Sequence, residues 1–315
     1  MKNAEENELY SAVRYDNFGG REVLYIAQLP KPAPGPGEVL IKVKAAGINP
    51  GEASIRQGYL EKMFPSTFPS GQGSDVAGVV EAVGEGVTMV ETGRDVIGYS
   101  NNRNAHAAYV VLPEEQVVLK PDNVSFEQAG GLFVAGTTAY AAVNAVRLTT
   151  GDVVVISGAA GGVGSVAVQL AHNQGAKVIG IAGEANHDWL KTHGAVPVTH
   201  GDGMEQRLQE ALGGEKPDAF IDLFGKGYVD LAIKLGIPAD RINTVIDFGA
   251  AGKHGVKTEG SHNAAHPWVL SELADMIHNG ALEFPVAKTY PLTEVQQAFE
   301  DLEQRHTHGK IVLIP

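Results

Sequence analysis

A glycine-rich loop is the part of this sequence best suited to chemistry. Residues 158–164 read Gly-Ala-Ala-Gly-Gly-Val-Gly and follow an apolar run at 152–157. A backbone without side chains lets N–H groups approach an anion, and a helix N-terminus favours negative charge. The N–H groups of Gly161, Gly162 and Val163 are therefore expected to contact a pyrophosphate.

The loop also fits a dinucleotide-binding fingerprint. Ala159 takes the first glycine position, Gly161 the second, and Gly164 the third, where a missing side chain lets helix and strand pack closely. On its own, such a match could also be a glycine-rich turn that only redirects the chain and binds no ligand. Here a helical pattern, a closing Gly175 and a second apolar run at 177–182 follow in order, which favours dinucleotide binding.

The end of the second run bears on the choice between NAD and NADP. An acid on the strand tip would bind the ribose of NAD, but the tip is Ala182. Glu184 is either that acid or a solvated first-turn residue, and we favour the second interpretation and NADP(H). The residues available to contact this end of the cofactor are Gly183, Asn186, His187 and Lys191.

These residues need a parallel sheet to position them. After about residue 121, apolar runs alternate with helix-length segments, the pattern of a doubly wound α/β sheet. The predicted strands are 152–157, 177–182, 196–199, 218–223, 244–248 and 256–260. A helix at 266–279, a second at 293–306 and a final strand at 309–315 complete the prediction.

The first third of the chain has a different rhythm. Between residues 10 and 120 the apolar runs are short and separated by Gly and Pro, which predicts a compact β-barrel. The two rhythms predict two domains in a chain of 315 residues.

Composition excludes several classes of protein. The net charge of −13 disfavours nucleic acid as a partner, and no apolar run reaches membrane-spanning length. Residues 1–15 lack the features of a signal peptide, so we expect a cytoplasmic protein. The absence of cysteine excludes disulfides, thiol catalysis and thiolate zinc sites.

Five ordered motifs carry a family resemblance. They are Ala-Gly-Ile-Asn-Pro at 46–50, Arg-Gln-Gly-Tyr at 56–59, Gly-Ser-Asp-Val-Ala-Gly-Val-Val at 73–80, Val-Ala-Gly-Thr-Thr-Ala-Tyr at 134–140 and His-Gly-Lys-Ile-Val-Leu at 308–313. With the glycine loop, the chain resembles the medium-chain dehydrogenase/reductase superfamily, in particular its zinc-independent quinone oxidoreductase (zeta-crystallin-like) branch. The resemblance implies a GroES-like β-barrel catalytic domain, 1–121 with 285–315, and a Rossmann domain, 122–284, with a doubly wound parallel sheet.

The resemblance also implies a metal-free site. Zinc-bearing relatives have a cysteine where this chain has Asn49, and Gly-His-Glu where it has residues 71–73. Asn49 is the family position near the nicotinamide, where its amide would orient and donate; the alternative is a local Asn-Pro turn. Tyr59 matches a tyrosine at the substrate mouth and is the candidate proton donor or oxyanion partner; the alternative is a half-buried packing residue. Glu52 and Arg56 are predicted to be helix-surface or salt-bridge residues.

Further cofactor contacts are carried over from the family. Thr138 matches a threonine whose hydroxyl meets the nicotinamide end, with helix packing as the alternative. Lys310 matches a lysine that reaches toward the cofactor, with a surface position as the alternative. Phe224 and Phe248 stand at the ends of predicted strands, at the carboxyl edge of the sheet, where such folds bind ligands, unless both are core residues.

Together these features predict an NADPH-dependent, metal-free reductase that transfers hydride to a quinone or an α,β-unsaturated carbonyl. Its partner would be that small molecule, and the family implies a homodimer paired through an edge strand such as 256–260. The alternative is a non-catalytic NADPH-binding sensor or structural protein on the same fold. The segments 223–227, 236–242 and 251–266 depart from the family pattern, so the substrate is not assigned.

Overall fold

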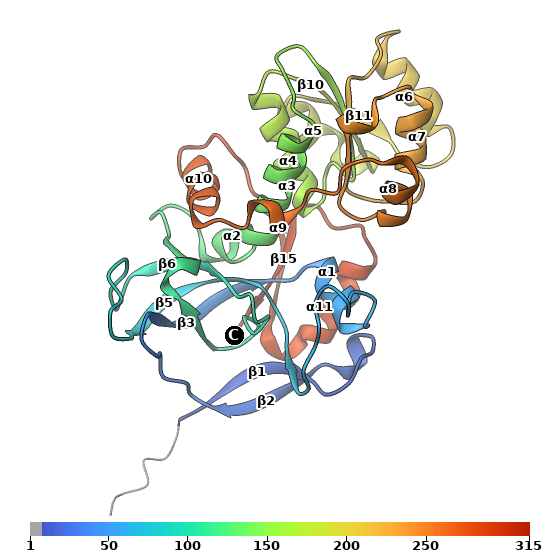
Figure 1. The fold of residues 1–315 in the computed structure, drawn as a ribbon. Coiled ribbons are helices and arrows are strands. Elements are labelled where there is room, and N and C mark those ends of the chain that lie inside the picture. The colour runs from blue at the N-terminus through green and yellow to red at the C-terminus, as the bar shows by residue number, and fades with distance from the viewer. Residues whose placement is uncertain (1–7) are drawn as a thin grey trace, which may run out of the picture.

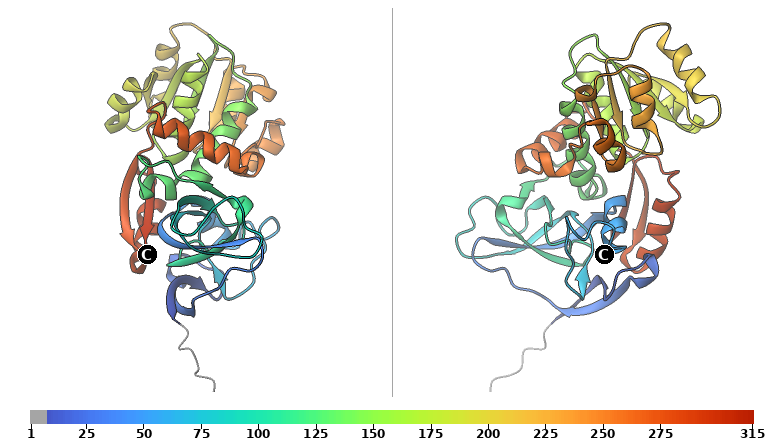
Figure 2. Two further views of the ribbon diagram at one scale, coloured as in Figure 1. Left: turned by 90° about the vertical axis from the view of Figure 1, so that its left-hand side faces the viewer. Right: turned by 45° about the vertical axis from the view of Figure 1, so that its right-hand side comes forward.

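The computed structural model describes residues 8–315 and consists of two lobes (Figure 1). Residues 1–7, which belong to the stretch predicted to lack a signal peptide, lie outside the described residues. Strands β1 to β8, β14 and β15 with helices α1 and α11 form one lobe, and a parallel sheet with its helices forms the other. Figure 2 shows the C-terminal segment running from the second lobe back along the first.

The first lobe is built on a seven-stranded sheet with the order β14-β15-β3-β5-β6-β8, in which β7 also pairs with β3. The strands of this sheet are β3 (Glu38–Gly47), β5 (Asp75–Val83), β6 (Asp95–Tyr99), β7 (Tyr109–Pro113), β8 (Val117–Leu119), β14 (Val286–Pro291) and β15 (Lys310–Ile314). A smaller sheet has the order β2-β1-β4, with β1 (Leu9–Tyr15), β2 (Tyr25–Pro30) and β4 (Ser70–Gly71). The last strand, β15, pairs antiparallel with β3, so the end of the chain completes the first sheet.

Two helices belong to this lobe. They are α1 (Pro50–Arg56) and α11 (Val295–Glu303). The first follows Asn49, whose backbone N–H donates to the Glu52 Oε2 atom at 3.0 Å, and Pro50 stands at a position where a helix needs no N–H. The all-β interpretation of the first third therefore missed one short helix, which begins directly after Asn49, the residue predicted to be catalytic.

The second lobe has a five-stranded, fully parallel sheet with the order β11-β10-β9-β12-β13. Its strands are β9 (Val153–Ser157), β10 (Lys177–Ala182), β11 (Ala195–Thr199), β12 (Ala219–Asp222) and β13 (Ile242–Thr244). When these five strands are numbered by their order in the chain, their order across the sheet is 3-2-1-4-5. This is the doubly wound arrangement, so the predicted fold class is confirmed.

Helices cover both faces of the parallel sheet. Val154 and Ile156 face α3, α4 and α10, whereas Val155 and Phe220 pack with α6, α7 and α8. The helices of this lobe are α2 (Phe126–Gly130), α3 (Leu132–Ala145), α4 (Gly162–Asn173), α5 (His187–Thr192), α6 (Met204–Leu212), α7 (Tyr228–Lys234), α8 (Phe248–His254), α9 (Ser261–Ala264) and α10 (Pro267–His278). Burial on both faces explains why these strands are apolar without alternation.

Two predicted strands were wrong. The strand predicted at 244–248 overlaps the observed strand β13 only at Thr244, where β13 ends. The chain turns there because the Thr244 hydroxyl accepts the N–H of Asp247 at 3.0 Å and the Asp247 carboxylate caps α8. The segment 256–260 is not a strand, since only Lys257 forms a β-bridge, to Asn243. The Asn243 side chain instead holds Glu259 through its backbone N–H and C=O, at 2.8 and 3.0 Å.

Candidate functional site

The glycine loop joins β9 to α4 as predicted. A Cβ on Gly164 would lie 2.1 Å from the Gly158 oxygen, so the close approach of helix and strand requires glycine there. A Cβ on Gly161 would meet only the Gly158 oxygen, at 3.5 Å, which leaves the space beside this residue open to a ligand. The cradle therefore fits the phosphates of a dinucleotide.

The N–H groups of the loop are not all available. Gly161 donates its N–H to the Gly158 oxygen at 3.1 Å, inside the turn. The expectation that this N–H contacts a pyrophosphate is therefore wrong for this conformation. Val163 and Gly164 lie in the first turn of α4, where N–H groups have no acceptor within the helix.

A C-terminal segment crosses the loop. The Gly309 N–H donates to the Ala160 oxygen at 3.0 Å, and Gly309 forms a parallel β-bridge with Gly161. The next side chain, Lys310, covers Gly162, where an added Cβ would lie 2.7 Å from the lysine Cδ. The chain thus brings β15 directly against the proposed phosphate loop.

The Lys310 side chain is buried, and the alternative of a surface lysine was wrong. Its ammonium donates to the Ile48 oxygen at 2.8 Å and to the Asn49 Oδ1 atom at 2.6 Å. The Asp75 carboxylate lies 3.5 Å from the same nitrogen. The methylene groups of Lys310 therefore contact the glycine loop, while its ammonium group binds Asn49.

Asn49 is held by charged groups on every side. Its Nδ2 atom donates to Glu52 Oε1 at 3.1 Å and to Asp75 Oδ2 at 2.9 Å, and its Oδ1 accepts from Lys310. Acceptors on one side and a donor on the other fix the orientation of the amide. Both amide hydrogens are engaged, so donation to a substrate would require one of them to leave its carboxylate.

Two acids complete this buried cluster. Asp75 also accepts the Val134 N–H at 2.6 Å, which places a carboxylate at the N-terminus of α3. Glu52 accepts the Ser74 N–H at 3.1 Å and lies 3.8 Å from the His106 Nε2 atom. We call Asn49, Glu52, Asp75, His106 and Lys310 the asparagine cluster.

The surface positions predicted for Glu52 and Arg56 were wrong, because both side chains are buried. Arg56 lies over the Phe299 ring and forms an ion pair with Glu303, 3.6 Å away, which agrees with the salt-bridge part of the prediction. Burial lowers the pKa of the Arg56 guanidinium. Sequence patterns did not reveal Asp75 or His106, although an acid that opens an apolar strand was a signal for the first.

The cluster does not suit a zinc ion. Its central side chain is an amide, which is not among the usual ligands of zinc, and the Lys310 ammonium already donates to the oxygen of that amide. Within residues 8–315, no group of three or more His, Cys, Asp and Glu residues is arranged to hold a metal.

Polar residues gather at the tip of β10. A Cβ on Gly183 would lie 3.7 Å from the His200 Nε2 atom and 3.9 Å from the Asn186 Nδ2 atom. His187 bonds to Thr199 through Nε2 at 3.3 Å. Glu184 is exposed and begins a short 3-10 helix, Glu184–Asn186, so it occupies a first-turn position. His200 had no signal in the sequence, because it follows the neighbouring strand.

Asn186 also connects this tip to the C-terminal segment. Its Oδ1 atom lies 2.7 Å from the His308 Nδ1 atom. The predicted phosphate donor Lys191 instead pairs with Asp188 on the surface, at 3.4 Å.

The aromatic residues differ in exposure. Phe224 follows β12, and its Cβ lies 3.6 Å from the position of an added Cβ on Gly158, so it borders the glycine loop. Phe248 begins α8 and is 49% exposed, so it neither ends a strand nor belongs to the core. Thr138 is buried in α3. Tyr59 is 79% exposed, so the alternative of a half-buried packing residue was wrong.

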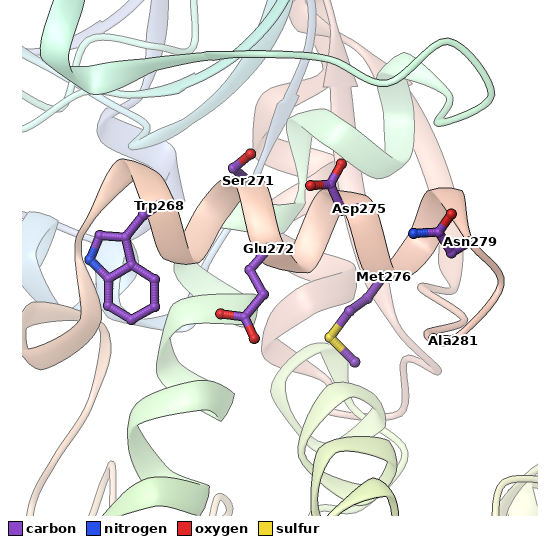
Figure 3. A pocket seen from close by; sticks show the side chains of 7 residues that line it. All are labelled: Trp268, Ser271, Glu272, Asp275, Met276, Asn279 and Ala281. Carbon is purple, nitrogen blue, oxygen red and sulfur yellow. The ribbon is translucent and has the colours of Figure 1, made fainter.

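One hollow lies away from these residues. It has a volume of about 510 Å³ and runs along α10 (Figure 3). Its lining residues are Trp268, Ser271, Glu272, Asp275, Met276, Asn279 and Ala281. None of them belongs to the asparagine cluster or the glycine loop, so the hollow is a separate surface feature.

Family comparisons agree with this architecture. Residues 35–122 match the model of the alcohol dehydrogenase GroES-like domain, and residues 194–313 match that of the zinc-binding dehydrogenases. The fold and these matches define a medium-chain dehydrogenase/reductase, as the motifs predicted.

Relatives narrow the assignment. Quinone oxidoreductase from Sus scrofa is 30% identical over 332 residues, covering 99% of each chain, and quinone oxidoreductase 1 from Escherichia coli is 29% identical over 96% of this chain and 99% of its own. Among solved structures, quinone oxidoreductase from Coxiella burnetii has a TM-score of 0.87 at 31% identity, covering 98% of this chain and 99% of its own. The chain belongs to the quinone oxidoreductase family.

A second solved structure bears on the cofactor. Escherichia coli quinone oxidoreductase complexed with NADPH has a TM-score of 0.82 at 26% identity, covering 97% of this chain and 100% of its own. Concerning membranes, none of the helices in residues 8–315 is long and apolar enough to cross a bilayer.

Proposed function

We propose that this protein is an NADPH-dependent, metal-free reductase of quinones or α,β-unsaturated carbonyls. The observation that carries the proposal is the pair Gly309 and Lys310. Gly309 is bonded to the glycine loop, and Lys310 is bonded to Asn49, so a phosphate cradle and the asparagine cluster are joined by adjacent residues. A cofactor seated on the loop would extend toward the cluster.

NADPH, when bound, supplies a hydride, so that a quinone, NADPH and one proton yield a quinol and NADP⁺. The open space beside Gly161 supports binding of the phosphates. Asn186, His187 and His200 around Gly183 are the candidate contacts for the 2′-phosphate, and the absence of an acid at Ala182 favours NADPH over NADH. The NADPH complex of the Escherichia coli relative supports the same choice.

The chain's own residues would orient the acceptor and deliver a proton. In this proposal Asn49 is held rigid by Lys310, Glu52 and Asp75, and forms a fixed wall beside the reacting atoms. Thr138 and Phe224 are the candidate contacts at the nicotinamide end. Tyr59 is the candidate proton donor at the mouth, where its exposure also gives water access.

Two measurements test the proposal. Fluorescence titration should show that NADPH binds more tightly than NADH, and failure of both nucleotides to bind would refute it. Consumption of NADPH should then follow addition of 1,4-benzoquinone, 9,10-phenanthrenequinone or crotonaldehyde. Tight NADPH binding without turnover of any acceptor would instead favour a sensor or structural protein. Stoichiometric zinc in elemental analysis would favour an alcohol dehydrogenase.

The role of Tyr59 has its own test. We expect Tyr59→Phe to lower kcat by less than about 3-fold, because a side chain this exposed leaves water free to protonate the product. Steady-state kinetics with and without deuterated solvent measure this. A loss above about 100-fold would make the phenol the obligatory donor.

Assembly and location are also proposals. We propose the domain division 1–121 with 285–315 and 122–284, a cytoplasmic location and a homodimer. The exposed Trp268 lies beside Lys257 and Glu259 in a groove next to the edge strand β13, which supports an interface there. Light scattering would test the dimer, and Trp268→Glu should dissociate it.

A further inference from the structure

Three neighbouring strands of the parallel sheet each end in a buried polar residue. Ser157 is the last residue of β9, Asp222 of β12 and Thr244 of β13, and all three side chains are completely buried. The strands lie side by side in the order β9-β12-β13. The other two strands end differently, β10 at Ala182 and β11 at the partly exposed Thr199. The buried polar row therefore begins at β9 and continues only on the side of β12.

The Asp222 carboxylate connects this row. Its Oδ1 atom accepts the N–H groups of Phe224 and Gly225 at 3.1 and 2.9 Å. The same oxygen accepts the Ser157 hydroxyl at 2.7 Å, and Oδ2 accepts the Thr244 hydroxyl at 2.8 Å. Burial of a carboxylate is costly unless hydrogen bonds replace those it makes to water, and these four neutral donors replace them.

The two hydroxyl groups extend the network into the loops that follow the strands. The Ser157 oxygen accepts the Leu223 N–H at 3.0 Å, at the start of the loop after β12. The Thr244 oxygen accepts the Asp247 N–H at 3.0 Å, in the loop between β13 and α8. Each hydroxyl donates to Asp222 and accepts from a loop, so one carboxylate fixes the backbone of both loops.

These loops lie where the second half of a dinucleotide would bind. In doubly wound folds the pyrophosphate lies at the loop after the first strand, here β9, and the adenosine half lies toward the second, here β10. Strand β12 is on the other side of β9. Its loop borders the glycine loop, since a Cβ on Gly158 would lie 3.5 Å from the Leu223 oxygen and 3.6 Å from the Phe224 Cβ. The nicotinamide half would therefore meet the loops that Asp222 fixes.

We propose that Asp222 is a positioning residue for the nicotinamide half of the cofactor. Because its side chain is completely buried, it acts through the two loops and does not touch the ligand. The inference rests on the proposed function and extends it by naming the group that holds the loops facing the cofactor. An apolar residue at this position would suit the sheet, but it would leave the N–H groups of Phe224 and Gly225 without their acceptor.

Binding of the whole cofactor and of one half tests the proposal without turnover. The probes are NADPH and adenosine 2′,5′-bisphosphate, which contains the adenosine half but no nicotinamide. Calorimetry of Asp222→Asn should show a rise of about tenfold in the Kd for NADPH, because an amide offers one acceptor oxygen in place of two. The Kd for the bisphosphate should change less than about 2-fold.

Thr244 supplies a second pair of variants. Thr244→Val removes the hydroxyl and should raise the Kd for NADPH about 3-fold, whereas Thr244→Ser keeps the hydroxyl and should preserve the wild-type value. The bisphosphate should bind both variants equally. This pair also decides the question if Asp222→Asn does not fold, because equal NADPH affinities of the two Thr244 variants would overturn the proposal.

Asp218→Asn is the matched control. Asp218 directly precedes β12, at the opposite end of the strand, and its carboxylate also accepts a backbone N–H, that of Val153 at 2.8 Å. This variant should change neither affinity. Equal weakening of NADPH and bisphosphate binding in Asp222→Asn would show that Asp222 supports the domain as a whole, and would overturn the proposal. Unchanged NADPH binding would overturn it as well.

The wild-type protein separates this inference from the proposed function. If it binds neither NADPH nor the bisphosphate, both fail. If it binds both ligands and the variants show no selective loss of NADPH affinity, only the positioning role of Asp222 fails. If the selective loss is found but no quinone or enone is reduced, the role of Asp222 stands and the reductase proposal fails.

Discussion

The asparagine cluster and the tip of β10, the two ends of the candidate cofactor site, are built in opposite ways. At the asparagine cluster, Asn49 uses all its amide groups on three charged partners, and every member is buried. At the tip of β10, His200 and Glu184 are exposed and Asn186 is half-buried. The side chains of the asparagine cluster are therefore fixed before a ligand binds, whereas those at the tip of β10 remain free to form new contacts with it.

This difference teaches where rigidity is useful. Reacting atoms need fixed neighbours, because a small misplacement lowers the rate steeply. Recognition of a phosphate needs only donors within reach, and exposed side chains can supply them. Substitutions should therefore change stability at the first end and cofactor choice at the second.

The largest effect is expected from Lys310→Met. Removal of the ammonium leaves the Asp75 carboxylate buried without its cation, which should cost about 3–5 kcal/mol of unfolding free energy. Urea denaturation measures this. The control Lys288→Met removes a surface pair with Asp301 and should cost less than about 1 kcal/mol. Equal losses would mean that the cluster is no more rigid than the surface.

A smaller loss is expected from Gly164→Ala. The added Cβ would lie 2.1 Å from the Gly158 oxygen, so α4 must move away from β9, at a cost of about 1–3 kcal/mol and with weaker NADPH binding. Thermal unfolding and fluorescence titration measure both. In α8, Gly252→Ala meets nothing within 4 Å and should be neutral or stabilising. Unchanged NADPH binding in Gly164→Ala would argue against the loop as the phosphate site.

The open end should respond in selectivity rather than stability. Asn186→Asp places a carboxylate beside Gly183, where it would repel a 2′-phosphate, and should raise the Kd for NADPH about tenfold while sparing NADH. Glu184→Gln, the control, removes an exposed first-turn acid and should change the ratio of the two Kd values less than 2-fold. A gain in NADPH affinity in the control would identify Glu184 as the selecting acid.

The smallest effect concerns pH. Burial lowers the pKa of His308, Glu283 opposes this shift, and His193 adds to it. Below about pH 6.5 the unfolded chain then binds more protons than the folded one, so the unfolding free energy falls as the pH falls. His308→Gln should flatten this slope in urea titrations between pH 7 and 5, whereas the exposed His306→Gln should leave it unchanged.

The sequence predicted the parts of the molecule that depend on local pattern. The glycine loop, β9, β10 and the helix ending at Gly280 follow from periodicity and turn residues, and the structure confirms them. The ordered motifs led to the correct family. The strand predicted at 256–260 was wrong because pairing of an edge segment depends on Asn243, a contact that no local pattern contains.

Site residues were less predictable, for the same reason. Asn49 and Lys310 were named separately, but nothing in the sequence showed that they bond to each other. His200 lies on a segment distant in sequence from Gly183, the residue it approaches. Burial of Glu52 and Arg56 likewise depends on packing against other strands and helices.

The bond between Lys310 and Asn49 joins residues 261 positions apart. During synthesis the sheet of the first lobe therefore cannot be completed until β15 has been made. The parallel sheet of the second lobe, whose last strand ends at Thr244, can form earlier. A nascent chain would hold a finished glycine loop before it holds a finished asparagine cluster. The capacity to bind a nucleotide would therefore arise earlier in synthesis than the capacity to position a substrate beside it.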